Sequence, residues 1–174
     1  MGADELSPMS EGHACWERDG FTVTSDPARI DRVAVHAFLS GCYWAEGIPR
    51  ATVDRSIDGS LCFALLNGEE QIGFARVITD RATFAYLGDV HVLDAWRGQG
   101  LGRWLMDCVM QHPDLSGLRR WVLVTRDAHA LYAPLGFTPL ANPAGYMELH
   151  RPDVYRGGSY CGNSNCTSSG TEKS

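Results

Sequence analysis

The sequence predicts a mixed α/β fold, with a central, largely antiparallel sheet of about six or seven strands flanked by helices. In the first half, apolar strand-like runs follow one another through tight turns, as in an antiparallel meander. In the second half, the order strand, glycine-rich turn, helix and strand indicates a crossover between two parallel strands. The chain has 174 residues, of which 44% are hydrophobic, enough for one domain with a buried core.

The first expected elements are a short strand and a helix. Phe21–Thr24 alternates apolar and polar residues, which is typical of a half-buried strand. Ser25 or Asp26 is expected to cap a helix with Pro27 in its first turn, and Gly41 is expected to end it. Residues 42–57 are expected to be irregular or to contain a second short helix.

Three consecutive strands form the expected meander. Leu61–Leu66 is an apolar strand, and Asn67-Gly68 makes the hairpin turn that follows it. Gln71–Thr79 is the returning strand. Ala82–Leu93 is the third strand, with a bulge expected near Gly88.

The second half predicts a helix, a strand, a short helix and two short strands. Their expected ranges are about Gly100–Gln111, Arg120–Thr125, Ala128–Leu135, Phe137–Leu140 and Gly145–His150. His112-Pro113 stops the first of these helices, and Thr125 or Asp127 caps the second.

We expect one folded domain over residues 20–155. A polar N-terminal lead over residues 1–19 and a tail rich in Gly, Ser and Asn over residues 156–174 flank it. Cys161 and Cys166 in the tail either remain free thiols or pair in an oxidising medium.

The composition excludes several classes of protein. A formal net charge of −6 argues against a general nucleic-acid binder and suits a cationic substrate. No apolar run is long enough for a membrane span, and the acidic N-terminus does not resemble a secretory signal. The cysteines and histidines lack zinc-ligand spacing. We therefore expect a cytoplasmic protein without a metal, and a homodimer is compatible with the sequence.

The most informative segment is Val90–Gly102 (VHVLDAWRGQGLG), a strand, a glycine-rich turn and the start of a helix. Such a turn directs backbone N–H groups and the positive end of a helix dipole at one point, which suits a phosphate. The spacing differs from the G-x-G-x-x-G pattern of dinucleotide folds, and no Lys-Ser or Lys-Thr completes a P-loop. A tight turn without a ligand is the alternative.

Two segments together resemble the GCN5-related N-acetyltransferase (GNAT) superfamily. Arg97–Gly102 (RGQGLG) is similar to the family's R/Q-x-x-G-x-G/A loop, and Ala128–Phe137 (AHALYAPLGF) is similar to its A-x-x-L-Y-x-x-x-G-F signature. The resemblance implies the GNAT acyl-CoA N-acyltransferase fold, in which the strands near residues 83–93 and 119–125 splay apart. It also implies acetyl-CoA as the cosubstrate, with its pantetheine arm in the splay.

The resemblance implies a coenzyme A site made mostly of main-chain groups. Arg97 would add a charge-assisted bond or serve only as a loop strut, and Arg103 would reach a phosphate or remain solvated. Many relatives have Asn where Thr125 stands, so the contact of that Asn amide with the pantetheine arm would here be lost or replaced by Asp127 or by water. The full expected set is Val90, Val92, Arg97, Gly98, Gln99, Gly100, Leu101, Gly102, Arg103, Thr125 and Asp127.

Three residues are candidates for proton transfer. Tyr132 matches the family tyrosine that acts as general acid on the coenzyme sulfur; the alternative is a buried structural aromatic. Asp89 and His91 lie two apart on one strand, and either could accept the proton of the amine. Asp89 is our first choice, although a structural role is as well supported, and His91 could also point to solvent.

The acceptor site is expected under the segment Tyr43–Arg50, which in this fold lies over the mouth of the cleft. Tyr43 and Trp44 suit an organic substrate or a cation, whereas Glu46 suits an amine. Arg50 and Arg76 suit a carboxylate. Loop anchors and surface charges are the alternative interpretation for the first four of these residues, and for Arg76 the alternative is a strand arginine whose charged end reaches solvent.

The sequence therefore predicts an acetyl-CoA-dependent N-acetyltransferase that acts on a small primary amine or amino-acid-like molecule by direct transfer in a ternary complex. A protein lysine or N-terminal amine is the second expectation. A non-catalytic acyl-CoA-binding module is the third.

Overall fold

The computed structural model describes residues 12–156, which fold around one open six-stranded sheet. The strands lie in sequence order, and every neighbouring pair is antiparallel except β5 and β6, which are parallel. The strands are β1 (Cys15–Arg18), β2 (Phe21–Thr24), β3 (Leu61–Asn67), β4 (Glu70–Thr79), β5 (Phe84–Val92) and β6 (Arg120–Leu123). The expected meander and crossover are both confirmed.

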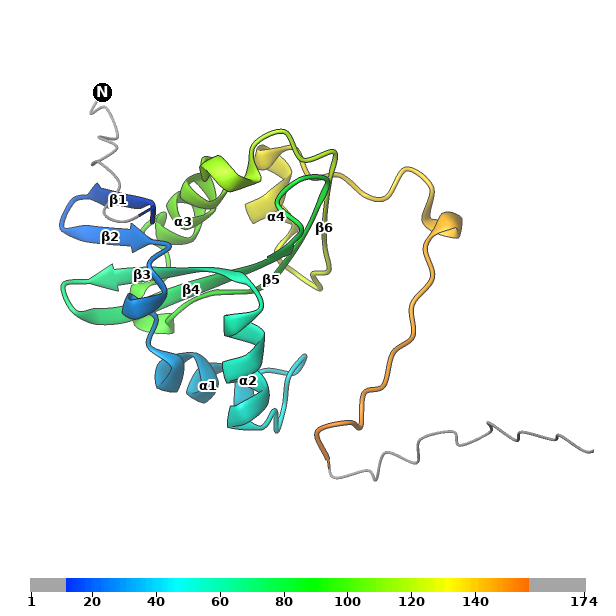
Figure 1. Cartoon of the computed structure of the whole chain (residues 1–174), viewed down its shortest axis with the longest axis horizontal. Coiled ribbons are helices and arrows are strands. Elements are labelled where there is room, and N and C mark those ends of the chain that lie inside the picture. The colour runs from blue at the N-terminus through cyan, green and yellow to red at the C-terminus, as the bar shows by residue number, and fades with distance from the viewer. Residues whose placement is uncertain (1–11, 157–174) are drawn as a thin grey trace, which may run out of the picture.

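Helices cover both faces of the sheet (Figure 1). The helices α1 and α2 lie on one face, and α3 and α4 lie on the other. Their bounds are α1 (Arg32–Ser40), α2 (Arg50–Asp58), α3 (Leu101–Met110) and α4 (His129–Tyr132). Short 3-10 turns occupy Pro27–Arg29, Asp94–Trp96, Pro113–Leu115, Ala133–Leu135 and Pro143–Gly145.

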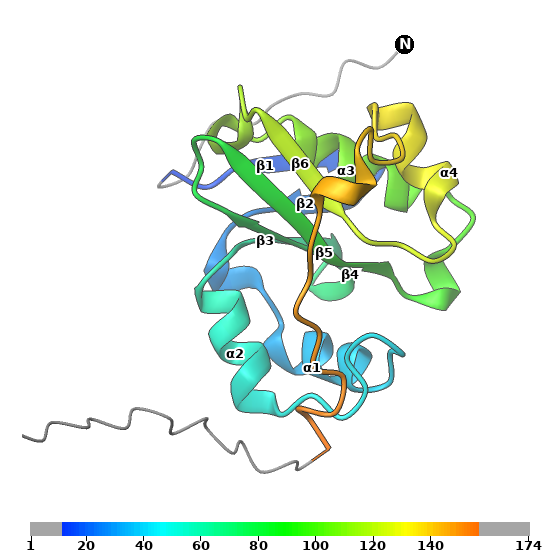
Figure 2. The ribbon, with the colours of Figure 1, turned by 90° about the vertical axis from the view of Figure 1, so that its right-hand side faces the viewer.

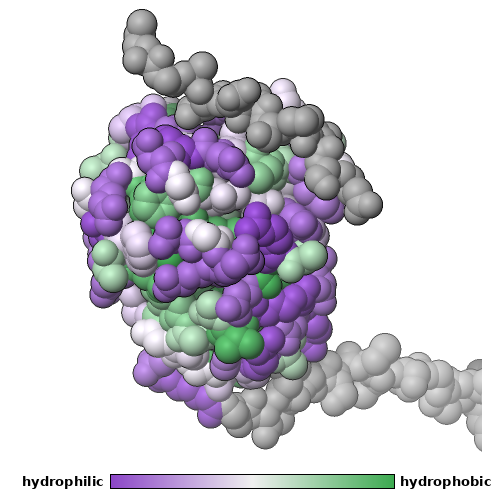
Figure 3. Space-filling view, turned by 90° about the vertical axis from the view of Figure 1, so that its left-hand side faces the viewer, coloured by the Kyte–Doolittle hydropathy of each residue, from purple (hydrophilic) through white to green (hydrophobic). Residues whose placement is uncertain are grey.

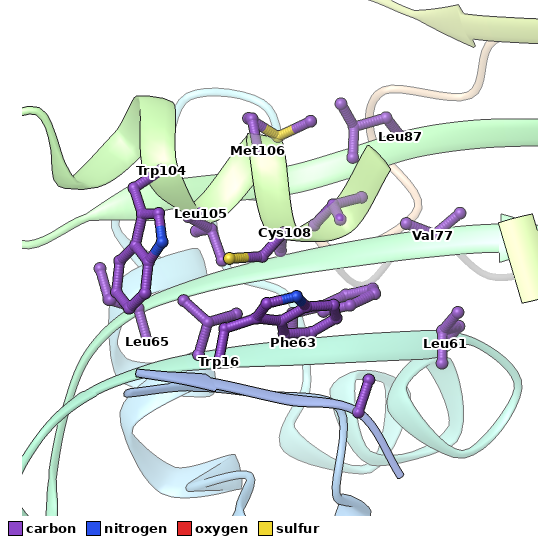
Figure 4. Close-up of a cluster of buried hydrophobic side chains, with 14 of the residues drawn as sticks. Trp16, Leu61, Phe63, Leu65, Val77, Leu87, Trp104, Leu105, Met106 and Cys108 are labelled. Atoms are coloured by element: carbon purple, nitrogen blue, oxygen red, sulfur yellow. The ribbon is translucent and has the colours of Figure 1, made fainter. Parts of the chain in front are cut away.

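The sheet separates two hydrophobic cores. In the larger core, the side chains of α3 face the central strands, and Trp104 and Leu105 lie over Leu65 and Phe63 (Figure 4). In the smaller core, α1 and α2 pack against the opposite face of β3 and β4, with Phe74 at its centre. Two buried faces explain why β3 is apolar along almost its whole length.

A bulge interrupts β5 where the sequence analysis expected one. The register between β4 and β5 shifts between Phe74 and Arg76, opposite the segment after Gly88. Asp89 takes a left-handed backbone conformation there, with φ of 57°. This conformation is uncommon outside glycine, although Asp tolerates it better than most residues do. The bulge therefore changes the direction of every side chain that follows it in β5.

The two parallel strands separate just before the bulge. Their register pairs Phe84–Leu87 with Arg120–Leu123, and β6 ends there, whereas β5 continues to Val92. The second half of β5 therefore has no strand beside it on the β6 side within residues 12–156. This is the predicted splay, and the glycine-rich turn begins at its end.

The N-terminal part of the chain corrects two predictions. Cys15–Arg18 belongs to the sheet as β1, so the polar lead expected through residue 19 is wrong for these residues. Asp26 caps only the 3-10 turn that contains Pro27, and the helix itself starts at Arg32 with Asp31 as its cap. The Asp31 side chain accepts bonds from two backbone amides, which makes it the stronger cap.

The two C-terminal strands expected at Phe137–Leu140 and Gly145–His150 do not form. Residues 138–156 instead run as an exposed, mostly extended segment that stands off from the sheet and ends near α1 (Figures 1 and 2). Tyr155 packs against the core under α1, and Arg156 pairs with Glu46 at 3.3 Å. The expected tail with Cys161 and Cys166 lies outside the described residues.

The surface is mixed in polarity. On the face toward the left of Figure 1, hydrophilic side chains surround smaller hydrophobic patches (Figure 3). Within residues 12–156, no helix is long and apolar enough to cross a membrane. The same part of the chain contains no group of three or more His, Cys, Asp or Glu side chains arranged to hold a metal ion.

Candidate active site

The glycine-rich turn links the end of β5 to the N-terminus of α3. After the 3-10 turn, the backbone is left-handed at Gly98 (φ 78°) and at Gly100 (φ 75°), a conformation that favours glycine. A Cβ atom built on either residue meets no other atom of the described chain within 4 Å. The backbone of the turn is thus open to a ligand.

The first amides of α3 lie at this open turn without partners. Gly100 is the N-cap and offers no side-chain acceptor, and the first helical bond runs from Trp104 N–H to the Gly100 carbonyl at 3.0 Å. Among the described residues, no hydrogen-bond acceptor meets the N–H groups of Leu101, Gly102 and Arg103. Unsatisfied amides at the positive end of a helix are suited to a diphosphate, so these residues fit that part of coenzyme A.

Both arginines expected at the cofactor are engaged within the protein. Arg97 Nε donates to the Val92 carbonyl at 3.0 Å, and its Nη1 pairs with Asp94 at 2.8 Å. Arg103 Nε pairs with Asp107 at 2.9 Å, one turn along α3. Arg97 therefore braces the turn against the end of β5, as in the loop-strut alternative. A cofactor contact from either arginine remains a prediction.

The hydrogen-bond pattern of β5 turns one backbone amide toward the splay. Leu93 N–H donates to the Ile72 carbonyl at 2.8 Å, so these two residues form a hydrogen-bonded pair. Val92 and Gly73 come next in the register and form a non-hydrogen-bonded pair, whose N–H groups face away from each other. The Val92 N–H therefore faces the splay, while the side chains of Val90 and Val92 pack on the α3 core.

Asp89 is held by side chains from two other segments. Arg76 Nε on β4 donates to Oδ2 at 2.6 Å, and the Trp44 indole N–H donates to Oδ1 at 3.3 Å. The ion pair is largely buried, with 16% of the Arg76 side chain and 10% of the Asp89 side chain exposed. Arg76 also reaches the Ser60 hydroxyl at 3.3 Å. Arg76, expected at a substrate carboxylate, thus binds an internal carboxylate instead.

His91 lies buried between aromatic rings on the same face of the sheet as Asp89. Its ring stacks on Phe38 with centroids 3.5 Å apart, and Phe74 lies 6.1 Å away. His91 Nδ1 lies 3.0 Å from the Asp89 carbonyl, which can only accept, so Nδ1 carries the proton. Burial lowers the pKa of His91 to about 4, which keeps the ring neutral at pH 7. The prediction that His91 could point to solvent is wrong.

The remaining ring nitrogen, Nε2 of His91, is an unprotonated acceptor. It has no hydrogen-bond partner within residues 12–156. In that range the one fully buried side-chain polar atom without a partner is Trp16 Nε1. His91 Nε2 is therefore not completely buried, and no group within residues 12–156 occupies its lone pair.

Tyr132 lies on α4, on the β6 side of the splay. The residue is only 8% exposed, packs on the α3 core and has its ring 5.9 Å from that of Phe137. Its hydroxyl makes no hydrogen bond within residues 12–156, yet it is not a fully buried atom, so it reaches the surface. Burial raises the pKa of Tyr132 to about 12, so the hydroxyl keeps its proton at pH 7.

Thr125 has a structural role at the start of α4. Its hydroxyl accepts a bond from Ala128 N–H at 3.0 Å, which braces the loop before α4, although Ala128 and not Thr125 is the N-cap of that helix. Asp127 is exposed, with Arg126 at 3.9 Å as its ionic partner, and it does not cap the helix. Their contacts with coenzyme A remain predictions.

The expected acceptor residues divide into two groups. Tyr43 and Trp44 lie beside Asp89: the Trp44 indole donates to the Asp89 carboxylate, and the Tyr43 and Trp44 rings meet edge to face at 5.0 Å. Arg50 Nε instead donates to both carboxylate oxygens of Asp54 within α2, at 3.1 Å each. Glu46 is paired with Arg156. Of the five expected acceptor residues, the structure thus brings the aromatic pair and Arg76 together with Asp89, but not Glu46 or Arg50.

Two residues that contact the predicted site residues His91 and Tyr43 were not predicted from the sequence. Phe38 lies on α1 and is not among the expected site residues, because its stacking on His91 has no local sequence signal. The Arg126 guanidinium carbon lies 4.0 Å from the centre of the Tyr43 ring, although 83 positions separate the two residues in the chain. Only the tertiary fold brings these pairs together.

The structure combines an open sheet with a splay, unpartnered backbone amides at one end of the splay and candidate proton-transfer groups on either side. This combination is typical of one class of protein, enzymes that bind an acyl-coenzyme A. The family model for the acetyltransferase (GNAT) domain matches residues 58–139. "Putative acetyltransferase FG08082" of Gibberella zeae is 34% identical over 140 residues, which cover 67% of this chain and 78% of that protein.

Solved structures agree with this classification. A GNAT-family protein from Xanthomonas campestris pv. campestris is 51% identical, with a TM-score of 0.76 and coverage of 78% of this chain and 96% of that one. A Deinococcus radiodurans R1 protein, 22% identical with a TM-score of 0.62, covers 79% of this chain and 94% of its own and supports the fold alone. The chain belongs to the GNAT acetyltransferase family, and acetyl-CoA is the cosubstrate that this family implies.

Proposed function

We propose that the protein is an N-acetyltransferase that moves the acetyl group of acetyl-CoA directly to a primary amine of a small or amino-acid-like molecule. The observation that carries this proposal is the open glycine-rich turn, with its unpartnered amides, at the end of a splay that the Val92 N–H faces. Proton-transfer candidates lie on both sides of the splay, Asp89 and His91 on β5 and Tyr132 on α4, which follows β6. The family membership supports acetyl transfer, whereas the amine acceptor is our inference.

The chain's own groups would bind and polarise the donor. When bound, acetyl-CoA supplies an acetyl thioester. The amides at the start of α3 would hold its diphosphate, and Arg97 would keep the turn fixed against β5. The Val92 N–H would donate to the carbonyl oxygen as negative charge develops on it.

Proton transfer would involve one group on each side of the splay. His91 Nε2 accepts the proton that the amine loses as its nitrogen bonds to the acetyl carbon. The Tyr132 hydroxyl donates a proton to the sulfur as the carbon–sulfur bond breaks. The products are an amide and a thiol. We favour His91 over Asp89 as the base because Arg76 and Trp44 already use the Asp89 carboxylate.

The test offers purified protein acetyl-CoA with three kinds of acceptor: small primary amines, a lysine-containing peptide and a peptide with a free N-terminus. We expect thiol release that depends on a small amine, together with the acetylated amine in the mass spectrum. Faster acetylation of either peptide would contradict the small-molecule acceptor and favour a protein acceptor. Coenzyme A binding without acetylation of any acceptor would contradict the enzymatic function and favour a binding module.

The predictions of a metal-independent reaction, a cytoplasmic location, a homodimer and no nucleic-acid partner remain our proposals. A single assay tests the first: activity that survives a chelator supports it, and activity that the chelator abolishes contradicts it.

A further inference from the structure

The face of the Tyr43 ring holds a cation. The Arg126 guanidinium carbon lies 4.0 Å from the ring centre, well within the roughly 6 Å over which a cation is attracted to an aromatic face. The ionic partner of Arg126 is Asp127 at 3.9 Å, and both of these side chains are about two-thirds or more exposed. Tyr43 itself is 57% exposed. Because the Arg126 guanidinium is exposed and has only this weak ion pair, a cationic ligand can displace it from the Tyr43 ring.

This contact crosses the mouth of the splay. Tyr43 belongs to the loop between α1 and α2, whereas Arg126 belongs to the loop between β6 and α4. Tyr43 stands edge to face against Trp44 at 5.0 Å, and the Trp44 indole donates to Asp89 at 3.3 Å. The cation therefore lies two side chains away from Asp89, separate from the place where the amine must react.

We propose that the Tyr43 ring face binds a second positive charge of the acceptor, and that Arg126 occupies this site until the acceptor displaces it. The proposal rests on the proposed amine acetylation and names its substrate class, an alkyl diamine or a similar dication. A nitrogen that stays charged on the ring cannot attack the thioester, so the reacting amine must be a different one. Arg126 has the same form as such an acceptor, an alkyl chain that ends in a cation.

The test compares cadaverine with pentylamine, two acceptors that differ only in the terminal ammonium group. We expect cadaverine to have the larger kcat/KM, by roughly two- to fivefold for an exposed cation on an aromatic face. Tyr43→Leu should bring the ratio of the two kcat/KM values close to one. Tyr43→Phe should preserve the ratio, because the phenyl ring keeps the negative face that attracts the cation.

A second variant tests the role of Arg126. Arg126→Ala removes the internal cation, so the KM for cadaverine should fall relative to that for pentylamine. Tyr146→Leu is the matched control, because Arg120 lies over the Tyr146 ring at 5.8 Å in another cation–aromatic pair outside the site. This control should keep the wild-type ratio.

Calorimetric titration with cadaverine separates this inference from the proposed function. If neither amine is acetylated, the proposed function fails, yet cadaverine binding that Tyr43→Leu abolishes and Tyr43→Phe retains still supports the cation site. If both amines are acetylated equally well, or if Tyr43→Leu keeps the preference for cadaverine, the cation site is wrong while the acetyltransferase stands.

Discussion

Burial shifts the pKa of His91 and of Tyr132 in opposite directions for one physical reason. A poorly hydrated site disfavours the charged form of any group, which is the imidazolium of His91 and the phenolate of Tyr132. The pKa of His91 falls and that of Tyr132 rises. At pH 7 the histidine is therefore an unprotonated acceptor and the tyrosine a protonated donor, as the proposed reaction requires.

Tyr132→Phe should lower kcat by roughly 100-fold, because it removes the proposed proton donor to the sulfur. The free energy of unfolding should change little, because the hydroxyl has no hydrogen-bond partner among residues 12–156. Rates of thiol release and urea unfolding measure the two effects, with the exposed Tyr146→Phe as control. An unchanged kcat would remove Tyr132 from the reaction.

His91 should make the fold sensitive to acid. The pKa of His91 is about 4 in the folded protein, against an ordinary value near 6.5, so the unfolded chain binds more protons between these values. The free energy of unfolding is unaffected by His91 above about pH 6.5 and falls by up to about 3 kcal/mol as the pH drops toward 4.

The variant His91→Phe keeps an aromatic ring against Phe38 and should weaken this dependence on pH. Urea unfolding of both proteins at several pH values between about 7 and 4 provides the comparison. His112, whose pKa burial also lowers, is present in both proteins and cancels in the difference. Parallel pH profiles for the two proteins would contradict the assignment.

At the scale of elements, the site depends on the end of β5 and the start of α3. The bulge at Asp89 sets the direction of the side chains that follow, and the glycine-rich turn exposes the first amides of α3. The ion pair of Arg76 and Asp89 ties β4 to β5 beside the bulge. The proposed coenzyme A site would therefore depend on backbone shape more than on side-chain chemistry.

Gly100→Ala should weaken coenzyme A binding as well as the fold. A Cβ atom at φ of 75° costs about 1 kcal/mol or slightly more, although it has open space around it. Gly117→Ala is the matched control, with φ of 76° and equal space outside the turn. Both variants should lose similar unfolding free energy in urea, and only Gly100→Ala should raise the Kd measured by calorimetry. Equal Kd values would argue against the backbone anion site.

Arg76→Ala should destabilise the fold by about 3–5 kcal/mol, because it leaves the Asp89 carboxylate buried without a counter-ion. Arg50→Ala breaks a pair with Asp54 that is far more exposed and should cost no more than about 1 kcal/mol. Urea unfolding of the two variants at neutral pH measures the difference. Similar losses would mean that the Arg76 pair is effectively solvated.

At the scale of the whole molecule, two cores on opposite faces hold the sheet and so fix the splay. Phe63 is fully buried in the core beneath α3 (Figure 4). Phe84 at the start of β5 is instead 40% exposed. A substitution in the core should therefore disturb the proposed site through the sheet, although the substituted residue does not contact the site.

Phe63→Ala should cost about 3–5 kcal/mol of unfolding free energy, because it leaves a cavity in the core. Phe84→Ala should cost less than about 1 kcal/mol, since much of that ring is already in water. Thermal unfolding should show a clear drop in Tm for the first variant and a small one for the second. A reversed order of Tm values would contradict the assignment of the core.

The sequence by itself determined the meander, the crossover, the glycine-rich turn and the family, because strand periodicity, turn residues and glycine spacing are local signals. Tertiary structure alone decided the partners. Arg76 became the counter-ion of Asp89, His91 became a buried acceptor stacked on Phe38, and Arg126 came to lie on Tyr43. Contacts between residues distant in the chain depend on strand register and on the bulge, and no local pattern encodes either of them.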